Sequence, residues 1–323
     1  MHISIIIPAR NEQFYIPGLL DSIGQQLMGS GLDYEVLLAD NGSTDRTSTI
    51  AQERGAISIC CGGLTVGGAR NRAAARAAGE LLVFLDADMI LRNGWCARLS
   101  ELIVELREKD RQIIGGSLAA PPEAGWIGRA WFPNRRGGSS EARYVGSGHM
   151  IVPRRYFEAL GGFNVDLRTS EDYDLCIRAR QSSGRIRKCS ALAAYHRGVP
   201  RTPAEFFRRE LWHGSSGDVR SVLGQRVSWL AILWFFMHLG LLGSIILWGV
   251  TGGLNWAATF LLLGLGLVGL VGASSLRHGG LESWQVFGGR CLLYPLYYWA
   301  RITALFSLIT SSSPAPSMRL ERK

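Results

Sequence analysis

Short apolar runs and long apolar runs occupy different parts of this chain. Residues 2–8, residues 34–40 and the apolar part of residues 80–90 are short, and each is followed at once by polar, turn-forming residues. Such runs are typical of strands buried in a parallel sheet. Beyond Arg226 the apolar runs become much longer. The pattern therefore predicts an α/β domain followed by a membrane region.

Two of the long runs, residues 227–250 and 254–276, contain no Asp, Glu, Lys or Arg. Each reaches the length of about 20 residues that a helix needs to cross a bilayer. A buried core helix, the alternative, is usually shorter and amphipathic. Both runs are therefore predicted to be transmembrane helices.

A third apolar segment, residues 284–309, contains two arginines and a proline. On a helix, four of its polar residues fall on one stripe, which suits the membrane interface or a polar cleft better than lipid. The stripe consists of Arg290, Tyr294, Tyr297 and Arg301. Arginines before residue 227 and after residue 276, and the basic tail 311–323, favour the cytoplasmic side. We therefore favour two spans with an interfacial or re-entrant third segment over three full spans.

Charge and cysteine content narrow the class of protein. The formal net charge is +9, and nearly all of the positive residues are Arg. Because no basic motif interleaved with aromatics marks a nucleic-acid-binding module, we assign this charge to contact with anionic lipid headgroups. The six Cys show no metal or disulfide spacing and are expected to be small buried hydrophobes in a reducing compartment. The N-terminus starts with a strand rather than a signal peptide, so we expect a cytoplasmic catalytic part.

Two carboxylates, Asp86 and Asp88, stand at the end of the third short apolar run. The carboxyl end of a parallel strand is where open α/β sheets place ligands. Two acids held together repel each other, and a shared divalent cation, Mg²⁺ or Mn²⁺, relieves that repulsion. The alternative is a simple turn that begins at Asp88 and is capped by Asp86. The first two strands also end in polar residues, at 8–12 and 40–45, which favours a nucleotide crevice.

Four sequence blocks, in this order, resemble the inverting family 2 glycosyltransferases with the GT-A fold. The blocks are IIIPARNE, LADNGSTDRT, GGARNRAAARAAGELLVFLDADM and Ser170-Glu171-Asp172-Tyr173-Asp174. The resemblance covers roughly residues 1–215. It implies a GT-A nucleotide-diphospho-sugar transferase fold, a Rossmann-like mixed sheet flanked by helices, over residues 1–200. It also implies a UDP- or GDP-sugar donor and Mn²⁺ or Mg²⁺ as cofactor.

The resemblance also implies roles on the donor side of the site. In relatives the first acid of the Asp-x-Asp motif contacts the ribose and the second binds metal, so Asp86 and Asp88 receive these roles. His196 matches the late histidine that completes metal binding in some GT-A enzymes. The nucleotide-binding residues implied are Pro8, Ala9, Glu12, Asp40, Arg70 and Asp86. The alternatives are a solvated helix face for Arg70 and Arg72 and a structural role for His196.

The acids Glu171 and Asp172 are the candidates for work on the acceptor. Ser170 can cap a helix over residues 171–181, which puts both acids in a first turn where the helix dipole favours negative charge. That placement alone would be a structural explanation. In family 2 the aspartate of this pair is the general base, which implies that role for Asp172, with Glu171 orienting the acceptor or the base. The implied reaction is a single displacement with inversion.

Two further segments are expected to meet the acceptor or the lipid. Small residues around Gly148 match the region below the donor sugar in relatives, and His149 either touches the sugar or packs in the core. Residues 201–226 are predicted to form an amphipathic interfacial helix with a capping box at its start. Arg208, Arg209 and Trp212 on this helix suit the headgroup region.

Two differences from related motifs narrow the class of acceptor. The Gln-x-x-Arg-Trp motif of processive synthases is absent, which favours addition of a single sugar. Enzymes that glycosylate polyprenyl phosphate typically carry Gln where Ile90 stands, and that acceptor needs no general base. The leading hypothesis is therefore transfer to a hydroxyl of a lipid or lipid-linked saccharide, in cell-envelope biosynthesis at a bacterial cytoplasmic membrane. Transfer to polyprenyl phosphate is the runner-up, and a non-catalytic scaffold that binds nucleotide sugar is the third hypothesis.

Overall fold

The computed structural model describes residues 2–134, 138–214, 226–279 and 283–310. Two compact units make up the chain. Unit 1 contains residues 1–123 and 134–199, and unit 2 contains residues 124–133 and 200–323.

Unit 1 is a mixed α/β unit built on a sheet of nine strands. The strands are β1 (Ile3–Ala9), β2 (Tyr34–Asp40), β3 (Ile57–Cys60), β4 (Leu81–Leu85), β5 (Met89–Leu91), β6 (Gln112–Ala119), β7 (Ser139–Glu141), β8 (His149–Pro153) and β9 (Arg185–His196). The helices are α1 (Ile16–Leu27), α2 (Thr47–Glu53), α3 (Val66–Arg76), α4 (Trp95–Glu108), α6 (Arg154–Ala159) and α7 (Glu171–Gln181).

The strand order is β3-β2-β1-β4-β8-β6-β9-β5, and β7 pairs with β9. Strands β3, β2, β1 and β4 are parallel, whereas β8 runs antiparallel to both β4 and β6. The parallel half places the carboxyl ends of β1, β2 and β4 at one edge, as the short apolar runs predicted. The antiparallel β8 starts beside the end of β4, where His149 pairs with Leu85.

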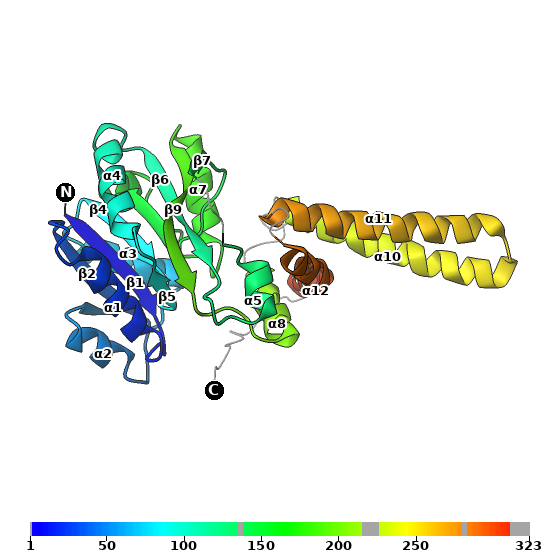
Figure 1. The fold of residues 1–323 in the computed structure, drawn as a ribbon, viewed down its shortest axis with the longest axis horizontal. Coiled ribbons are helices and arrows are strands. Elements are labelled where there is room, and N and C mark those ends of the chain that lie inside the picture. The colour runs from blue at the N-terminus through cyan, green and yellow to red at the C-terminus, as the bar shows by residue number, and fades with distance from the viewer. Residues whose placement is uncertain (1, 135–137, 215–225, 280–282, 311–323) are drawn as a thin grey trace. The chain divides into compact units, whose positions relative to one another are not determined.

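Both faces of the sheet are buried at β4, which explains why this strand is apolar throughout. Leu81, Val83 and Leu85 of β4 belong to the core shared with α1 and α4. Leu82 and Phe84 of the same strand belong to the core shared with α3, α6 and α7. Figure 1 shows the helices of unit 1 on the two sides of the sheet. The sheet edge that carries the strand-end acids is therefore held on both faces.

Unit 2 is helical. Its helices are α5 (Trp126–Trp131), α8 (Pro203–Gly214), α10 (Arg226–Thr251), α11 (Leu254–Gly279) and α12 (Trp284–Thr310). Helices α10 and α11 pack side by side, and α12 contacts α5, α8, α10 and α11. Helices α10, α11 and α12 are each long and apolar enough to cross a membrane. The mixed α/β sheet is thus followed by three C-terminal helices with the length and composition of membrane spans.

The polar stripe predicted on the third apolar segment faces other helices of unit 2. The Arg301 guanidinium pairs with the Glu210 carboxylate of α8 at 3.0 Å, and both side chains are largely buried. Arg290 is fully buried and donates from Nη1 to the Ser275 carbonyl of α11 at 3.0 Å. Tyr297 packs on Trp131 of α5. The stripe is therefore a helix-packing face, while two spans plus an interfacial segment stays a prediction.

Other sequence expectations meet the described residues only in part. Helix α8 begins with half of the predicted capping box: the Thr202 hydroxyl accepts a hydrogen bond from the Glu205 amide at 3.2 Å, but the Glu205 carboxylate accepts from the Arg201 amide, at 2.8 Å, rather than from that of Thr202. The interfacial segment 201–226 continues past α8 into residues 215–225, which lie outside the described residues, as does the basic tail 311–323. The expectation that the cysteines are buried is wrong for Cys60, which is exposed at the end of β3 next to buried Cys61.

Candidate active site

Asp86 follows the last residue of β4 and is fixed by its backbone and by its carboxylate. Its amide donates to the carbonyl of Gly148, just before β8, at 3.0 Å. Its Oδ1 accepts a hydrogen bond from Arg70 Nη2 at 2.8 Å, while the side chain stays 38% exposed. A Cβ at Gly148 would lie 2.3 Å from Asp86 Oδ2. Glycine at position 148 therefore gives Asp86 its room, which is how the structure uses the small residues of this segment.

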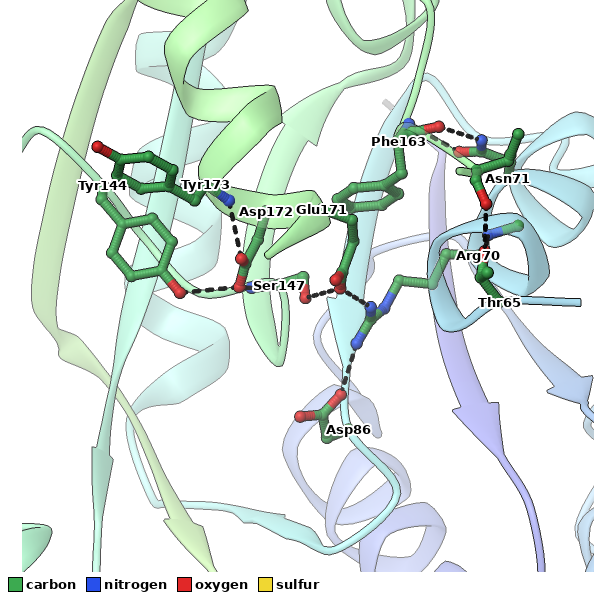
Figure 2. Close-up of polar contacts among 12 residues, drawn as sticks. Thr65, Arg70, Asn71, Asp86, Tyr144, Ser147, Phe163, Glu171, Asp172 and Tyr173 are labelled. Atoms are coloured by element: carbon green, nitrogen blue, oxygen red, sulfur yellow. Dashed lines mark hydrogen bonds and ion pairs between the residues drawn. The ribbon is translucent and has the colours of Figure 1, made fainter. Parts of the chain in front are cut away.

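Arg70 lies on α3 and joins acids from two distant parts of the chain. Its guanidinium bonds Asp86 through Nη2 and Glu171 through Nη1, the latter at 2.6 Å. The Phe163 ring lies 5.7 Å from the guanidinium carbon, and the arginine is only 3% exposed. The solvated-face alternative is therefore wrong for Arg70, although it holds for exposed Arg72. Figure 2 shows Arg70 between the two carboxylates.

Glu171 and Asp172 begin α7 and are linked to the loop before β8 by two residues of that loop, Ser147 and Tyr144. The Ser147 hydroxyl donates to Glu171 Oε1 at 3.1 Å, and the Ser147 amide donates to Asp172 Oδ2 at 3.1 Å. The Tyr144 hydroxyl donates to the same Asp172 oxygen at 2.9 Å. A continuous polar chain thus runs from Asp86 through Arg70, Glu171 and Ser147 to Asp172 and Tyr144 (Figure 2).

The two acids at the start of α7 have different surroundings. Glu171 is buried, and burial raises the pKa of its carboxyl; Arg70 opposes that rise, and the neighbouring Asp172 carboxylate adds to it. Asp172 is only partly buried. Burial of the hydroxyl end and the nearby Asp172 carboxylate together raise the pKa of Tyr144. The hydroxyl therefore stays protonated and donates a hydrogen bond to Asp172. Glu171 is therefore placed as a buried partner of Arg70, and Asp172 is the more accessible acid.

Helix α7 spans the predicted residues 171–181, but it does not start in the predicted way. Ser170 has a φ of 64°, in the left-handed region, and makes no side-chain cap bond to the helix. The prediction that Ser170 caps α7 is therefore wrong. The loop before it is instead held to α3, where the Asn71 amide group bonds both the N–H and the carbonyl of Phe163 at 2.9 and 2.7 Å.

Asp88 and His196, the two residues that the resemblance implies as metal ligands, lie beside each other. Strands β5 and β9 pair Met89 with His196, and this leaves His196 Nε2 3.7 Å from Asp88 Oδ1. Both side chains are largely buried. Within the described ranges, no group of three or more His, Cys, Asp or Glu gathers at one point. One carboxylate and one imidazole fit Mn²⁺ or Mg²⁺, because such ions commonly keep several waters or phosphate oxygens.

The ends of β1 and β2 form the third part of the site. Ala9 pairs with Asp40 across the two strands, next to the pair of Pro8 and Ala39. Asp40 Oδ1 accepts a hydrogen bond from the Ser43 amide at 2.9 Å, which shapes the turn after β2. The backbone amide of Glu12 donates to the Thr47 hydroxyl at 2.8 Å. The predicted nucleotide-binding residues of β1 and β2 are thus adjacent, at the same sheet edge as Asp86.

His149 lies in the core, where it packs against Trp95. The Trp95 indole N–H donates to His149 Nε2 at 2.9 Å, and the imidazole is 2% exposed. Burial lowers the pKa of His149 to about 4, so the ring is neutral at physiological pH. Of the two alternatives for His149, this placement favours packing over contact with the sugar.

Arg208, Arg209 and Trp212 belong to unit 2. Arg208 and Trp212 are exposed on α8. The Arg209 guanidinium stacks on the Phe132 ring, 4.7 Å from its centroid. The prediction that these residues meet lipid headgroups stays a prediction.

The sequence interpretation missed Tyr144 and Ser147 as partners of the acids. Ser147 is one of the small residues around Gly148, but a serine at this position is equally consistent with a turn. Tyr144 lies 28 residues before Asp172 in the chain. Only the pairing of β8 with β4 brings the loop that carries both residues to the acids. The local pattern gave no signal for that contact.

The mixed α/β sheet of unit 1 is typical of the GT-A fold. A mannosyltransferase of Pyrobaculum calidifontis, solved with GDP-Man and Mn²⁺, matches 96% of this chain and 88% of its own with a TM-score of 0.66 at 18% identity. The model of the family described as glycosyl transferase family 2 matches residues 4–152. The chain belongs to this family, because a curated glycosyltransferase is 32% identical to it and is matched over 68% of its own length.

Two curated relatives are similar to parts of the chain. A Mycobacterium tuberculosis protein named PGL/p-HBAD biosynthesis glycosyltransferase is 32% identical over 182 residues, which cover 54% of this chain and 68% of that protein. A Staphylococcus haemolyticus protein named 4,4'-diaponeurosporenoate glycosyltransferase is 40% identical over 98 residues, 28% of this chain. The match spans a quarter of the length of that second protein.

Proposed function

We propose that this protein is a membrane-bound inverting glycosyltransferase of cell-envelope biosynthesis, with its catalytic unit on the cytoplasmic side of a bacterial inner membrane. It moves a single sugar from a UDP- or GDP-sugar to a hydroxyl of a lipid or lipid-linked saccharide. The observation that carries the proposal is the polar chain from Asp86 to Asp172. Arg70 and Ser147 join the acid assigned to the donor with the acid assigned to the acceptor.

The donor lies at the carboxyl ends of β1, β2 and β4. Asp40 and the backbone around Ala9 bind the base, and Asp86 binds the ribose. Asp88 and His196 would hold Mn²⁺ or Mg²⁺, and that ion would neutralise charge on the leaving diphosphate. The mannosyltransferase of similar fold was solved with GDP-Man and Mn²⁺, which supports a metal of this kind here.

Asp172 acts on the acceptor. Its carboxylate takes the proton of the acceptor hydroxyl while that oxygen bonds to the anomeric carbon, and the nucleoside diphosphate leaves with the electrons of the old glycosidic bond. A positioned general base contributes about 10²–10⁴-fold to such a step. The partial exposure of Asp172 supports this role, whereas buried Glu171 is kept in an ion pair with Arg70.

The lipid nature of the acceptor rests on unit 2. Helices α10, α11 and α12 have the length and composition of membrane spans. Exposed Arg208 and Trp212 on α8 suit a headgroup region, where arginine binds phosphate and tryptophan lies among the headgroups. An enzyme held at the bilayer meets acceptors that are anchored there.

The test uses the full-length protein in nanodiscs with Mn²⁺, radiolabelled UDP- and GDP-sugars, and native bacterial membrane lipid extract as acceptor. We expect one donor to label the lipid phase with wild type, and we expect Asp88→Asn and Asp172→Asn to abolish most of the labelling. Asp174→Asn is the matched control, because Asp174 lies in the same helical turn but pairs with Arg178. No transfer from any donor, with nucleotide binding intact, would favour a scaffold instead.

A further inference from the structure

Tyr144 meets Asp172 with its hydroxyl while leaving part of its ring in solvent. The hydroxyl lies 2.9 Å from Asp172 Oδ2, and the residue is 38% exposed. The same carboxylate oxygen also accepts the Ser147 amide, and Oδ1 accepts the Tyr173 amide at 2.8 Å. Both oxygens are thus held by donors, and among these three donors Tyr144 alone is a side chain.

A second tyrosine extends this surface. The rings of Tyr144 and Tyr173 lie 5.8 Å apart between centroids at an interplanar angle of 59°. Figure 2 shows the two rings next to each other, on the same side of the Asp172 carboxylate. Two partly exposed aromatic rings thus lie beside the candidate base, and the donor-side roles described above involve neither of them.

The position of Gly146 leaves space at this point. A Cβ there would lie 3.6 Å from the Tyr144 hydroxyl and 3.7 Å from Asp172 Oδ2. A single methyl group there would be in ordinary contact with both atoms. A side chain longer than alanine would extend from that point beside the carboxylate.

We propose that Tyr144 and Tyr173 form an acceptor subsite for the ring of a saccharide, so that the acceptor is a lipid-linked saccharide rather than a simple lipid alcohol. This inference rests on the proposed function. A flat tyrosine ring packs against the C–H face of a pyranose, and tyrosine offers such area with few rotatable bonds. A flexible alkyl chain does not need a polar, rigid ring next to the base in order to bind.

Tyr144 has a second task in this arrangement, as a positioning residue for Asp172. Its hydroxyl holds the Asp172 carboxylate in place through Oδ2, and its ring lies beside the bound acceptor. The two tasks reside in different atoms of one side chain. Substitutions can therefore separate them.

Three variants separate the two tasks. Tyr144→Phe keeps the ring and removes the hydroxyl, so we expect kcat to fall by about 10-fold or more, as for a lost hydrogen bond to a charged group, with acceptor KM unchanged. Tyr173→Leu removes a ring and keeps the Tyr144 hydroxyl, so we expect acceptor KM to rise by about 3–10-fold with kcat near wild type. Tyr144→Leu should show both changes. Donor KM and melting temperature should match wild type in all three.

Competition identifies the class of acceptor. Octyl β-glucoside, octyl β-galactoside and 1-octanol share one alkyl chain, and only the first two carry a pyranose. They are added, each below its critical micelle concentration, to full-length enzyme in nanodiscs with native lipid extract. We expect a glycoside to compete with the acceptor and 1-octanol not to compete, and we expect Tyr173→Leu to weaken that competition.

The outcomes distinguish this inference from the function beneath it. Equal inhibition by 1-octanol and the glycosides, or no inhibition by either, would overturn the saccharide assignment. Wild-type kinetics in Tyr144→Phe and Tyr173→Leu, with active wild type, would overturn the subsite alone. Failure of wild type to transfer any sugar would overturn the proposed function, and this inference with it.

Discussion

Replacing Gly148 with alanine tests whether the site depends on the position of Asp86. The new Cβ would lie 2.3 Å from Asp86 Oδ2 and 2.9 Å from its Cγ, whereas ordinary contact begins at 3.4 Å. The carboxylate would have to retreat by about 1 Å. Its hydrogen bond to Arg70, now 2.8 Å long, would then stretch or break. A displacement of about 1 Å in a positioned group can lower the rate about 100-fold.

Gly146→Ala is the matched control, two residues away on the same loop. Its Cβ would meet its nearest neighbours, in Tyr144 and Asp172, at 3.6 and 3.7 Å, which is ordinary contact. Neither glycine has a φ in the left-handed region, so alanine strains neither backbone.

The assay measures kcat/KM for the donor with full-length protein in nanodiscs, together with the melting temperature. We expect Gly148→Ala to lose about 100-fold in kcat/KM while Gly146→Ala stays within a few-fold of wild type. Wild-type activity in Gly148→Ala would refute the reasoning, because Asp86 would then be free to move without consequence. Equal losses in both variants would also refute it, because the effect would then belong to the loop.

Three more predictions follow from buried charge, titration and metal binding. Arg70→Met leaves the buried Glu171 carboxylate without its cation and should destabilise the protein by about 3–5 kcal/mol. Adding Glu171→Gln should recover part of this loss, as measured by thermal unfolding. An unchanged melting temperature in Arg70→Met would contradict this prediction. Burial lowers the pKa of His149 to about 4, whereas in the unfolded chain its pKa is about 6.5. As the pH falls from 6.5 toward 4, the unfolded chain therefore binds a proton at His149 before the folded protein does, and the folded protein loses stability. His149→Gln should flatten this acid slope of melting temperature, and an unchanged slope would contradict the assignment. EDTA should weaken nucleotide-sugar binding measured by calorimetry, and Mn²⁺ should restore it in wild type but not in Asp88→Asn; binding indifferent to EDTA would argue against the metal.

The parts of the fold predicted from sequence are those that a local pattern determines. Strand β2 and helix α7 have the predicted bounds, residues 34–40 and 171–181. Strand β5 was missed because its three residues follow the Asp-Ala-Asp motif directly, where a turn was equally consistent. In long β9 only the apolar end, residues 191–195, has the local pattern of a strand, because the first half of β9 alternates with Arg and Lys. Short or charged strands depend on sheet pairing, which no local pattern reveals.

In the candidate site, too, the features predicted from sequence are those that a local pattern determines. Acids at strand ends are visible in sequence because parallel strands bring their carboxyl ends to one edge. The burial of Arg70 was not visible, because its partner Glu171 lies 101 residues away and local composition suggested a solvated helix. In unit 2, the polar stripe of α12 suggested a membrane interface, yet polar residues on a helix serve equally well against neighbouring helices. Glu210, the partner of Arg301, is 91 residues away in the chain.

The measurement that tests the central claim most directly compares the labelled lipid product of wild type with that of Asp172→Asn. The account predicts that wild type alone makes the product and that the product survives mild acid, as a glycoside formed on a hydroxyl does. An acid-labile product that Asp172→Asn still makes would contradict it, because a sugar bound to a polyprenyl phosphate needs no base for its formation.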